Sequence, residues 1–334
     1  MNKLQQFQAL SNGDCDLPKV LFRPILMHFA ARFIGKTYGA FASDYRVLVE
    51  ANLRCLDYFE TDMVGLISDP YRESAAFGAK IDFPVESVPR CTGSIIHSVD
   101  DVIALKNPDV IKSERTLDRI KGAELFQKEL KNKVPVIGWI EGPLAEACTL
   151  VGVNEMLMRL MTDEDFCHRL LDKCVITAKA FSKAQIEAGC HIMGIGDAIC
   201  SQIDPRTYNL YVKERHKEII EYIHNLGGKV KLHICGNITH LLDAIRELQV
   251  DILDLDWQVD LQHAFTIVGF GPIRCGNINP IFILEKNEEE IFREARRLIE
   301  QEKGRKYILS AGCEISVLTP HKNLKALAQA AKAQ

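Results

Sequence analysis

Lys229-Val-Lys-Leu-His-Ile-Cys-Gly-Asn237 is an apolar run that ends in two good metal ligands and a glycine. In a β-strand, residues two apart point to the same face, so His233 and Cys235 would lie side by side at the strand end. With ten histidines and eleven cysteines in 334 residues, a His-x-Cys pattern arises by chance in about one chain in three. The pattern is therefore informative only where the fold places this strand end in a functional position and a third ligand arrives from elsewhere.

Strand and helix patterns alternate on both sides of this stretch. The order is typical of a (β/α)₈ TIM barrel, and we expect one such domain over residues 1–334. A doubly wound open sheet is the alternative, and the absence of a G-x-G-x-x-G sequence after the first strand disfavours it. Strands are expected at 20–26, 62–67, 134–140, 191–197, 229–235, 251–256, 272–278 and 307–313, and helices at 44–59, 153–188 (a pair), 205–226, 239–248, 261–266, 287–303 and 322–333.

Residues 69–132 are long for a single connection between barrel elements. Pro84, Pro89 and Cys91-Thr-Gly93 predict a hairpin, followed by helices at about 98–107 and 113–130. We expect this segment to be an insertion after the second strand that forms a rim over the mouth of the barrel.

Composition and charge exclude several classes of function. A net charge of −4 without any block of Lys or Arg argues against nucleic-acid binding. No apolar run approaches the roughly 20 residues of a membrane span, and the N-terminus lacks the apolar core of a signal peptide. A cytoplasmic protein is therefore expected. The eleven cysteines lack the regular spacing of a disulfide scaffold, so most are expected to be reduced thiols.

Polar side chains gather at the expected C-terminal strand ends. In a TIM barrel these strand ends form the active-site face. His233, Cys235 and Cys313 would supply the three protein ligands of a catalytic zinc whose fourth position is open. Cys275 ends the strand between them and is a competing ligand. The other polar residues at strand ends are Glu141, Asp197, Asp256 and Asn277.

A zinc ion with two thiolate ligands would lower the pKa of a substrate thiol in the fourth position and leave electron density on its sulfur. The thiolate could then attack a methyl group on a good leaving group. Asp197 and Asp256 are candidate catalytic carboxylates and candidate occupants of the fourth position. Equally, they could cap the following helices or pair with Arg206 or Arg246.

Short motifs along nearly the whole chain carry a resemblance to a known family. They are Gly142-Pro143, Gly194-Ile-Gly-Asp197, His233-Ile-Cys-Gly-Asn237, Asp256-Trp257, Gly276-Asn-Ile-Asn-Pro280, and Gly312-Cys313 followed by Thr319-Pro-His-Lys-Asn-Leu-Lys325. With these motifs the chain resembles the uroporphyrinogen decarboxylase superfamily. The His-x-Cys and the late Cys resemble its zinc-dependent methylcobalamin:coenzyme M methyltransferase branch. This resemblance implies that His233, Cys235 and Cys313 bind Zn²⁺ and that a methyl group comes from a small corrinoid protein.

The chain also departs from the porphyrin decarboxylases. They carry Arg-Gln-Ala-Gly-Arg-Tyr after the first strand, whereas this chain has Met27-His-Phe-Ala-Ala-Arg-Phe33 and keeps one arginine. No D-x-H-x-x-G corrinoid signature occurs, so methylcobalamin is expected to arrive on a partner protein. The candidate residues for binding this co-substrate and the thiol are Arg23, His28, Arg32 and Asn277, and Arg23 or Arg32 would neutralise the sulfonate of coenzyme M.

Three functions therefore stay open at the level of sequence. The favoured one is a zinc methyltransferase acting between a corrinoid protein and a small thiol such as coenzyme M. The second is a metal-free tetrapyrrole carboxy-lyase of the uroporphyrinogen decarboxylase type. The third is a corrinoid-binding or porphyrin-binding barrel without catalytic turnover.

Overall fold

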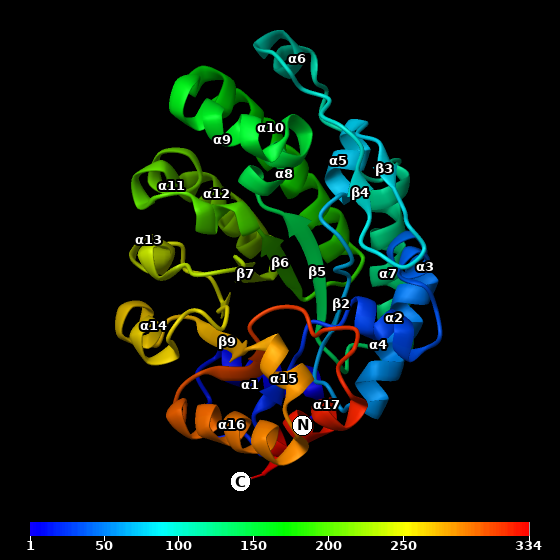
Figure 1. Ribbon diagram of the computed structural model, residues 1–334, viewed down its shortest axis with the longest axis vertical. Coiled ribbons are helices and arrows are strands. Elements are labelled where there is room, and N and C mark those ends of the chain that lie inside the picture. Colours follow the sequence, from blue (N-terminus) through cyan, green and yellow to red (C-terminus); the bar gives the residue numbers. More distant parts are fainter. Residues whose placement is uncertain (334) are drawn as a thin grey trace.

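The apolar runs expected to be strands form one parallel sheet in the computed structural model, which describes residues 1–333 (Figure 1). The strand order is β1-β10-β9-β8-β7-β6-β5-β2, and every neighbouring pair is parallel. The predicted (β/α)₈ barrel is confirmed. Its strands are β1 (Leu21–Phe22), β2 (Val64–Gly65), β5 (Val136–Glu141), β6 (Ile192–Gly196), β7 (Lys229–His233), β8 (Ile252–Asp254), β9 (Ile273–Ile278) and β10 (Tyr307–Ala311).

Helices surround the strands in chain order, from green α10 through yellow α13 and red α17 to α4 and α7 (Figure 1). Among the described residues, none of these helices combines the length and the apolar character needed to cross a membrane. The helices are α1 (Lys3–Ser11), α2 (His28–Phe33), α3 (Tyr38–Ser43), α4 (Tyr45–Tyr58), α5 (Arg72–Phe77), α6 (Val99–Ala104), α7 (Glu114–Leu130), α8 (Pro143–Val151), α9 (Val153–Thr162), α10 (Glu164–Glu187), α11 (Pro205–Tyr211), α12 (Lys213–Asn225), α13 (Leu242–Arg246), α14 (Leu261–Val268), α15 (Pro280–Glu285), α16 (Glu288–Gln301) and α17 (His321–Lys332), with 3-10 turns η1 (Ala198–Gln202) and η2 (Thr239–Leu241).

Asp62 bridges the seam between β1 and β2. Its backbone N–H donates to the carbonyl of Phe22 at 2.8 Å, and its side chain accepts the N–H of Phe22 at 2.8 Å. Lys19 donates to the same carboxylate at 2.6 Å. Because Asp62 is fully buried, these charge-assisted bonds hold the first two strands together where no regular ladder joins them.

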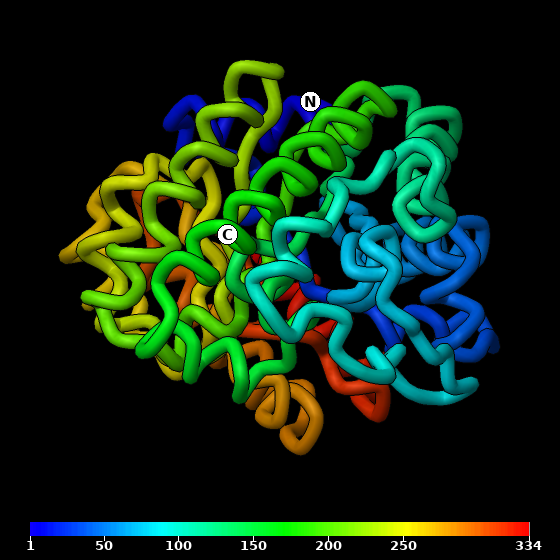
Figure 2. Tube along the Cα trace, turned by 90° about the horizontal axis from the view of Figure 1, so that it is seen from above, coloured from blue at the N-terminus to red at the C-terminus, as the bar shows by residue number. Residues whose placement is uncertain are grey.

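Helix α1 closes the N-terminal end of the barrel. Its buried residues Leu4, Phe7 and Leu10 pack against the early residues of the strands. Figure 2 shows this dark blue segment at the upper end of the molecule, with orange α15 and the red loop after β10 at the lower end. Because this apolar plug fills one end, the polar strand ends form a mouth at the opposite end, where barrels of this kind carry their chemistry. The strand residues in this plug are Leu21, Ile137, Ile192, Ile252, Ile273, Cys275 and Ile308.

The 69–132 segment has two parts. Its first part contains α5, a β-hairpin of β3 (Ile81–Asp82) and β4 (Arg90–Cys91), and α6. This part runs beside α8 to α10, where Ile95 N–H donates to the carbonyl of Leu150 at 2.9 Å (Figures 1 and 2). Its last part, α7, packs on α4 and β5 as one of the outer helices of the barrel.

Helices α2 and α3 were not expected from the sequence. No side chain caps the N-terminus of α2, so the region after the first strand carries no helix-start signal there. By contrast, the expected helix at 287–303 begins with a capping box between Asn287 and Glu290, which satisfies backbone donors at both positions.

Candidate metal centre

Three side chains from two strand ends meet at the mouth of the barrel. His233 is the last residue of β7, Cys235 follows in the next loop, and Cys313 follows β10. His233 Nε2 lies 3.0 Å from Cys235 Sγ, and the two sulfurs lie 3.7 Å apart. All three ligand atoms lie within 4.8 Å of one another.

Two glycines allow the loops to bring these ligands together. Gly236 has φ +89°, a conformation that side-chain-bearing residues rarely adopt. A Cβ on Gly312 would lie 2.3 Å from the backbone nitrogen of Trp257. Glycine is therefore required beside Cys313, because the loops after β8 and β10 touch through their backbones.

Asp254 fixes the orientation of the imidazole. His233 Nδ1 donates to Asp254 Oδ2 at 3.0 Å, and Lys231 Nζ contacts the same oxygen. Burial alone would raise the pKa of Asp254, but Lys231 and His233 hold it well below its usual range. Because the carboxylate has no proton to give, Nδ1 carries an imidazole proton, and Nε2 is the nitrogen that faces the two cysteines and that would bind a metal.

The two thiols differ electrostatically. A hydrogen bond from Cys235, with His233 beside it, lowers the pKa of Cys313. The same bond and burial raise the pKa of Cys235. Burial would lower the pKa of His233, but hydrogen bonds to Asp254 and Cys313 outweigh it and raise the pKa. The cluster therefore already stabilises one thiolate, the form of cysteine that binds metals.

This donor set fits zinc. Two sulfurs bound tetrahedrally at about 2.3 Å from the ion would lie about 3.8 Å apart, close to the observed 3.7 Å. A histidine held by a carboxylate is the usual supporting arrangement of zinc ligands. With three protein ligands, the set leaves one position for a substrate.

A cavity of about 190 Å³ opens directly on the three ligands. For comparison, a protein cavity of about 150 Å³ holds benzene. Trp139 forms part of the wall, with its ring 5.9 Å from that of His233. The apolar lining consists of Ile25, Met27, Ile67, Pro70, Val88, Trp139 and Ala198, and the acidic lining of Asp69, Glu141 and Glu314.

Glu141, the last residue of β5, is the most strongly perturbed carboxyl of this cavity. Its Oε1 accepts hydrogen bonds from Arg72 at 2.7 Å and from the indole of Trp139 at 3.1 Å. Burial raises its pKa to about 8, because Arg72 compensates only part of the lost hydration and Glu73 lies nearby. On the far side of the cavity, burial raises the pKa of Glu314 to about 7.

The two predicted catalytic aspartates lie beside the cavity rather than in its lining. Asp197 is fully buried and accepts hydrogen bonds from Ala145 N–H at 2.8 Å and from His216 Nε2 at 3.0 Å. It therefore holds the start of α8. Asp256 accepts the N–H of Gly236 at 3.0 Å and so shapes the turn that follows Cys235.

The four residues predicted to bind co-substrate or thiol also lie outside this cavity lining. Arg23 is buried, and its charge contributes to lowering the pKa of Asp254. His28 stacks on Tyr38, with ring centroids 4.8 Å apart. Arg32 is exposed on α2. Asn277 donates to the carbonyl of Val259 at 2.6 Å and lines a separate cavity of about 530 Å³.

Sequence reasoning missed Asp254, Lys231 and Glu314, and it gave Trp139 no role. The competing ligand Cys275 is buried, with its sulfur 4.0 Å from Lys231 Nζ, and it does not belong to the three-residue cluster. His233 and Asp254 are register partners on neighbouring strands, and this register was not predicted from the sequence.

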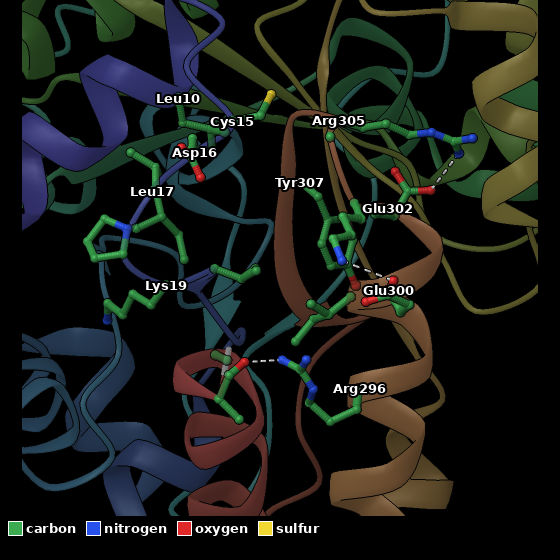
Figure 3. Close-up of a pocket in the computed structure, with 18 residues that line it drawn as sticks. Leu10, Cys15, Asp16, Leu17, Lys19, Arg296, Glu300, Glu302, Arg305 and Tyr307 are labelled. Atoms are coloured by element: carbon green, nitrogen blue, oxygen red, sulfur yellow. Dashed lines mark hydrogen bonds and ion pairs between the residues drawn. The ribbon is translucent and has the colours of Figure 1, made fainter.

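Another cavity, of about 230 Å³, lies at the opposite end of the barrel beside the first residues of β1 and β10 (Figure 3). Several of its charged residues already have partners in the fold. Arg305 contacts Glu302 at 3.3 Å, and Arg296 donates to the carbonyl of Ala330 at 3.2 Å. No histidine lines it among the described residues, so we place the chemistry at the mouth.

A family model described as uroporphyrinogen decarboxylase (URO-D) matches residues 6–334. The chain belongs to the uroporphyrinogen decarboxylase family. Its relatives in the family are enzymes of two kinds. The methylcobamide:CoM methyltransferase MtbA of Methanosarcina mazei is 27% identical over 264 residues, which cover 78% of this chain and 76% of that protein. The uroporphyrinogen decarboxylase of Citrifermentans bemidjiense is 29% identical over 266 residues, which cover 77% and 75%.

Solved structures of other proteins superpose on this chain and have the same fold. A methyltransferase from Methanosarcina mazei superposes with a TM-score of 0.89 at 20% identity, over 99% of this chain and 98% of that one. A B12-independent methionine synthase from Shewanella sp. W3-18-1 gives a TM-score of 0.59 at 12% identity, over 86% of each chain. The predicted family is confirmed.

Proposed function

We propose that this protein is a zinc-dependent methyltransferase that moves a methyl group between methylcobalamin on a corrinoid protein and a small thiol. The observation that carries the proposal is the meeting of His233, Cys235 and Cys313 at the mouth, with a cavity directly in front of them. The similarity to a methylcobamide:CoM methyltransferase supports it.

The reaction balances without an external oxidant or reductant. The thiol sulfur forms a bond to the methyl carbon, and the cobalt–carbon bond breaks. Both electrons of that bond stay on cobalt, which goes from Co(III) to Co(I), and the thiol proton leaves to solvent. When bound, zinc would lower the pKa of the thiol and orient its sulfur.

The residues of the chain hold the reacting groups in position. Asp254 orients His233, so the imidazole keeps Nε2 directed at the site, where it would bind the metal. Trp139 and the apolar wall exclude water from the sulfur that must attack. Because the cavity is open on one side, a methyl group could approach the sulfur from outside at near-attack distance.

The corrinoid protein is proposed to dock on the rim of the mouth. The loop between β3 and β4 exposes Val85 and Val88, and Val88 also lines the cavity. Trp257 and Leu318, in the loops after β8 and β10, are exposed as well. Exposed apolar residues in these three loops are suited to burial against a partner.

Zinc content and methyl transfer test the proposal together. Purified protein should hold close to one zinc per chain, and X-ray absorption should show sulfur and nitrogen neighbours at about 2.3 and 2.0–2.1 Å. With methylcobalamin and a small thiol, the methyl–cobalt absorbance should fall, and Cys235→Ala should abolish both the zinc and the reaction. A protein that bound no zinc and decarboxylated a porphyrinogen would instead support the carboxy-lyase function of its other relatives.

A further inference from the structure

The cavity in front of the candidate metal centre has an acidic lining without a cation. Among the described residues, its charged side chains besides His233 are Asp69, Glu141 and Glu314, and no lysine or arginine lines it. The arginines expected to bind a sulfonate are not available, because Arg23 is buried outside the lining and Arg32 is exposed on α2.

The three carboxyls are not equally neutralised. Asp69 pairs with Arg115 at 2.6 Å and accepts the hydroxyl of Ser68 at 2.5 Å, so its charge is compensated within the fold. Glu314 accepts the backbone N–H of His28 at 2.9 Å and forms no ion pair with Lys or Arg in the described chain. The hydrogen bond from this backbone N–H is therefore the contact that the fold offers its carboxyl.

Glu141 shares its cation with other carboxyls. Arg72 lies 2.7 Å from Glu141 and 3.7 Å from Glu73, and Glu146 is buried close by without any hydrogen-bond partner. One guanidinium thus faces three glutamates. Glu141 is only 7% exposed, and its Oε1 takes both protein hydrogen bonds. Its Oε2 is the unpartnered oxygen of a buried side chain that lines the cavity.

The metal ligands would not reverse this polarity. Two thiolates balance the charge of a divalent ion, and the imidazole of His233 is neutral as a ligand. A sulfonate in this cavity would be desolvated among carboxyls with no partner, which is costly for a buried anion. An ammonium group would instead find acceptors at Glu141 and Glu314, and its positive charge would favour the ionised form of Glu141, whose pKa burial raises.

We propose that the thiol substrate is an aminothiol, with a cationic ammonium group a few bonds from its sulfur, and that Glu141 selects it against thiol sulfonates. This proposal rests on the methyltransferase function proposed above. It concerns the part of the substrate that does not react and leaves the transfer itself unchanged.

Three thiols of the same length test the proposal with free methylcobalamin as donor. They are 2-aminoethanethiol, 2-mercaptoethanol and 2-mercaptoethanesulfonate, which carry a cation, a neutral hydroxyl and an anion. Rates are measured by the loss of the methyl–cobalt absorbance. The KM of the zinc-loaded enzyme should be lowest for the aminothiol, and at least about tenfold higher for the sulfonate.

Variants separate the contribution of the cavity from the intrinsic reactivity of each thiol. Glu141→Gln should reduce the ratio of kcat/KM for the aminothiol to kcat/KM for the sulfonate by about tenfold. Glu124→Gln, on the exposed face of α7, removes one negative charge away from the mouth and should leave the ratio unchanged. Ala198→Lys would add an ammonium group at an exposed position of the lining, and it should raise the use of the sulfonate relative to Ala198→Met.

The outcomes distinguish the two proposals. If the sulfonate has the lowest KM and Glu141→Gln leaves the ratio unchanged, the aminothiol assignment is wrong while the methyltransferase function stands. If no thiol removes the methyl group from cobalt in a zinc-loaded enzyme, the methyltransferase function fails and the substrate assignment fails with it. Because Ala198→Lys changes an exposed position, its result holds even where Glu141→Gln fails to fold.

Discussion

His233 Nδ1 lies 3.0 Å from Asp254 Oδ2, and the two residues face each other across the β7–β8 pair. Lys231, two residues before His233 on the same face of the strand, contacts the same carboxylate oxygen. The buried ion pair of Lys231 and Asp254 thus holds Nδ1 of the imidazole. The other nitrogen, Nε2, faces Cys235 and Cys313. The candidate metal centre and the barrel interior are therefore connected through Asp254.

Asp254→Asn should weaken zinc binding by about 10-fold to 100-fold, because the neutral amide no longer fixes the tautomer of His233 or raises its basicity. Zinc affinity is measured by competition with a chelator of known affinity. Asp251→Asn is the matched control. Asp251 also contacts a histidine, His224, at 2.8 Å, but at the N-terminal end of the same strand. Equal zinc affinity in Asp254→Asn and the unaltered protein would show that the carboxylate has no part in holding the metal.

The sequence was sufficient to predict that His233, Cys235 and Cys313 meet at one end of the barrel, for a simple reason. Strand periodicity placed His233 and Cys235 on one face, and the barrel rule brought Cys313 to the same end. Neither step depends on detailed packing. The structure brings the three atoms within 4.8 Å.

The supporting charges could not be read in the same way. Lys231 and Asp254 lie within apolar strands, where a charged residue usually marks a solvent-facing side, yet both are almost completely buried. Their burial depends on the register between β7 and β8, which sequence patterning does not determine. For the same reason the substrate cations were sought at Arg23 and Arg32, which the folded chain directs elsewhere.

Cys313→Ala should reduce bound zinc from near one per chain to a small fraction, since one of three ligands is lost. Cys275→Ala should retain the metal, because this buried thiol lies in the apolar plug beneath the site. Metal analysis after dialysis against a weak chelator distinguishes the two variants. Retained zinc in Cys313→Ala, or loss of zinc in Cys275→Ala alone, would exchange the roles of the two cysteines.

Gly312→Ala should destabilise the protein by about 1–3 kcal/mol and lower its zinc content. The added Cβ would lie 2.3 Å from the nitrogen of Trp257, and backbone atoms cannot yield as a flexible side chain does. The loop after β10 must then move and carry Cys313 with it. Gly271→Ala is the control, because its Cβ would meet nothing closer than 3.5 Å. Urea unfolding and zinc content are measured for both, and an unchanged Gly312→Ala would mean that the loops after β8 and β10 separate freely.

Glu146→Met should stabilise the protein by about 1–3 kcal/mol at pH 8, because it removes a buried carboxyl whose two oxygens have no partner. Burial, followed by the charges of Glu73 and Glu141, raises the pKa of Glu146 well above its usual value of 4.5. Between pH 4.5 and the raised pKa, Glu146 has lost its proton in the unfolded chain but keeps it in the folded chain. The folded state therefore binds more protons, and this group lowers stability as pH rises.

The gain in stability from Glu146→Met should accordingly grow from pH 5 to pH 8. Urea unfolding at a series of pH values measures it, with Glu124→Met on the exposed face of α7 as the control for the loss of one carboxyl. A variant that is less stable than the unaltered protein at pH 8 would mean that Glu146 is ionised and held by Arg72. In that case the guanidinium would serve Glu146 as well as Glu141, and the acidic side of the cavity would carry even less compensation than its ion pairs indicate.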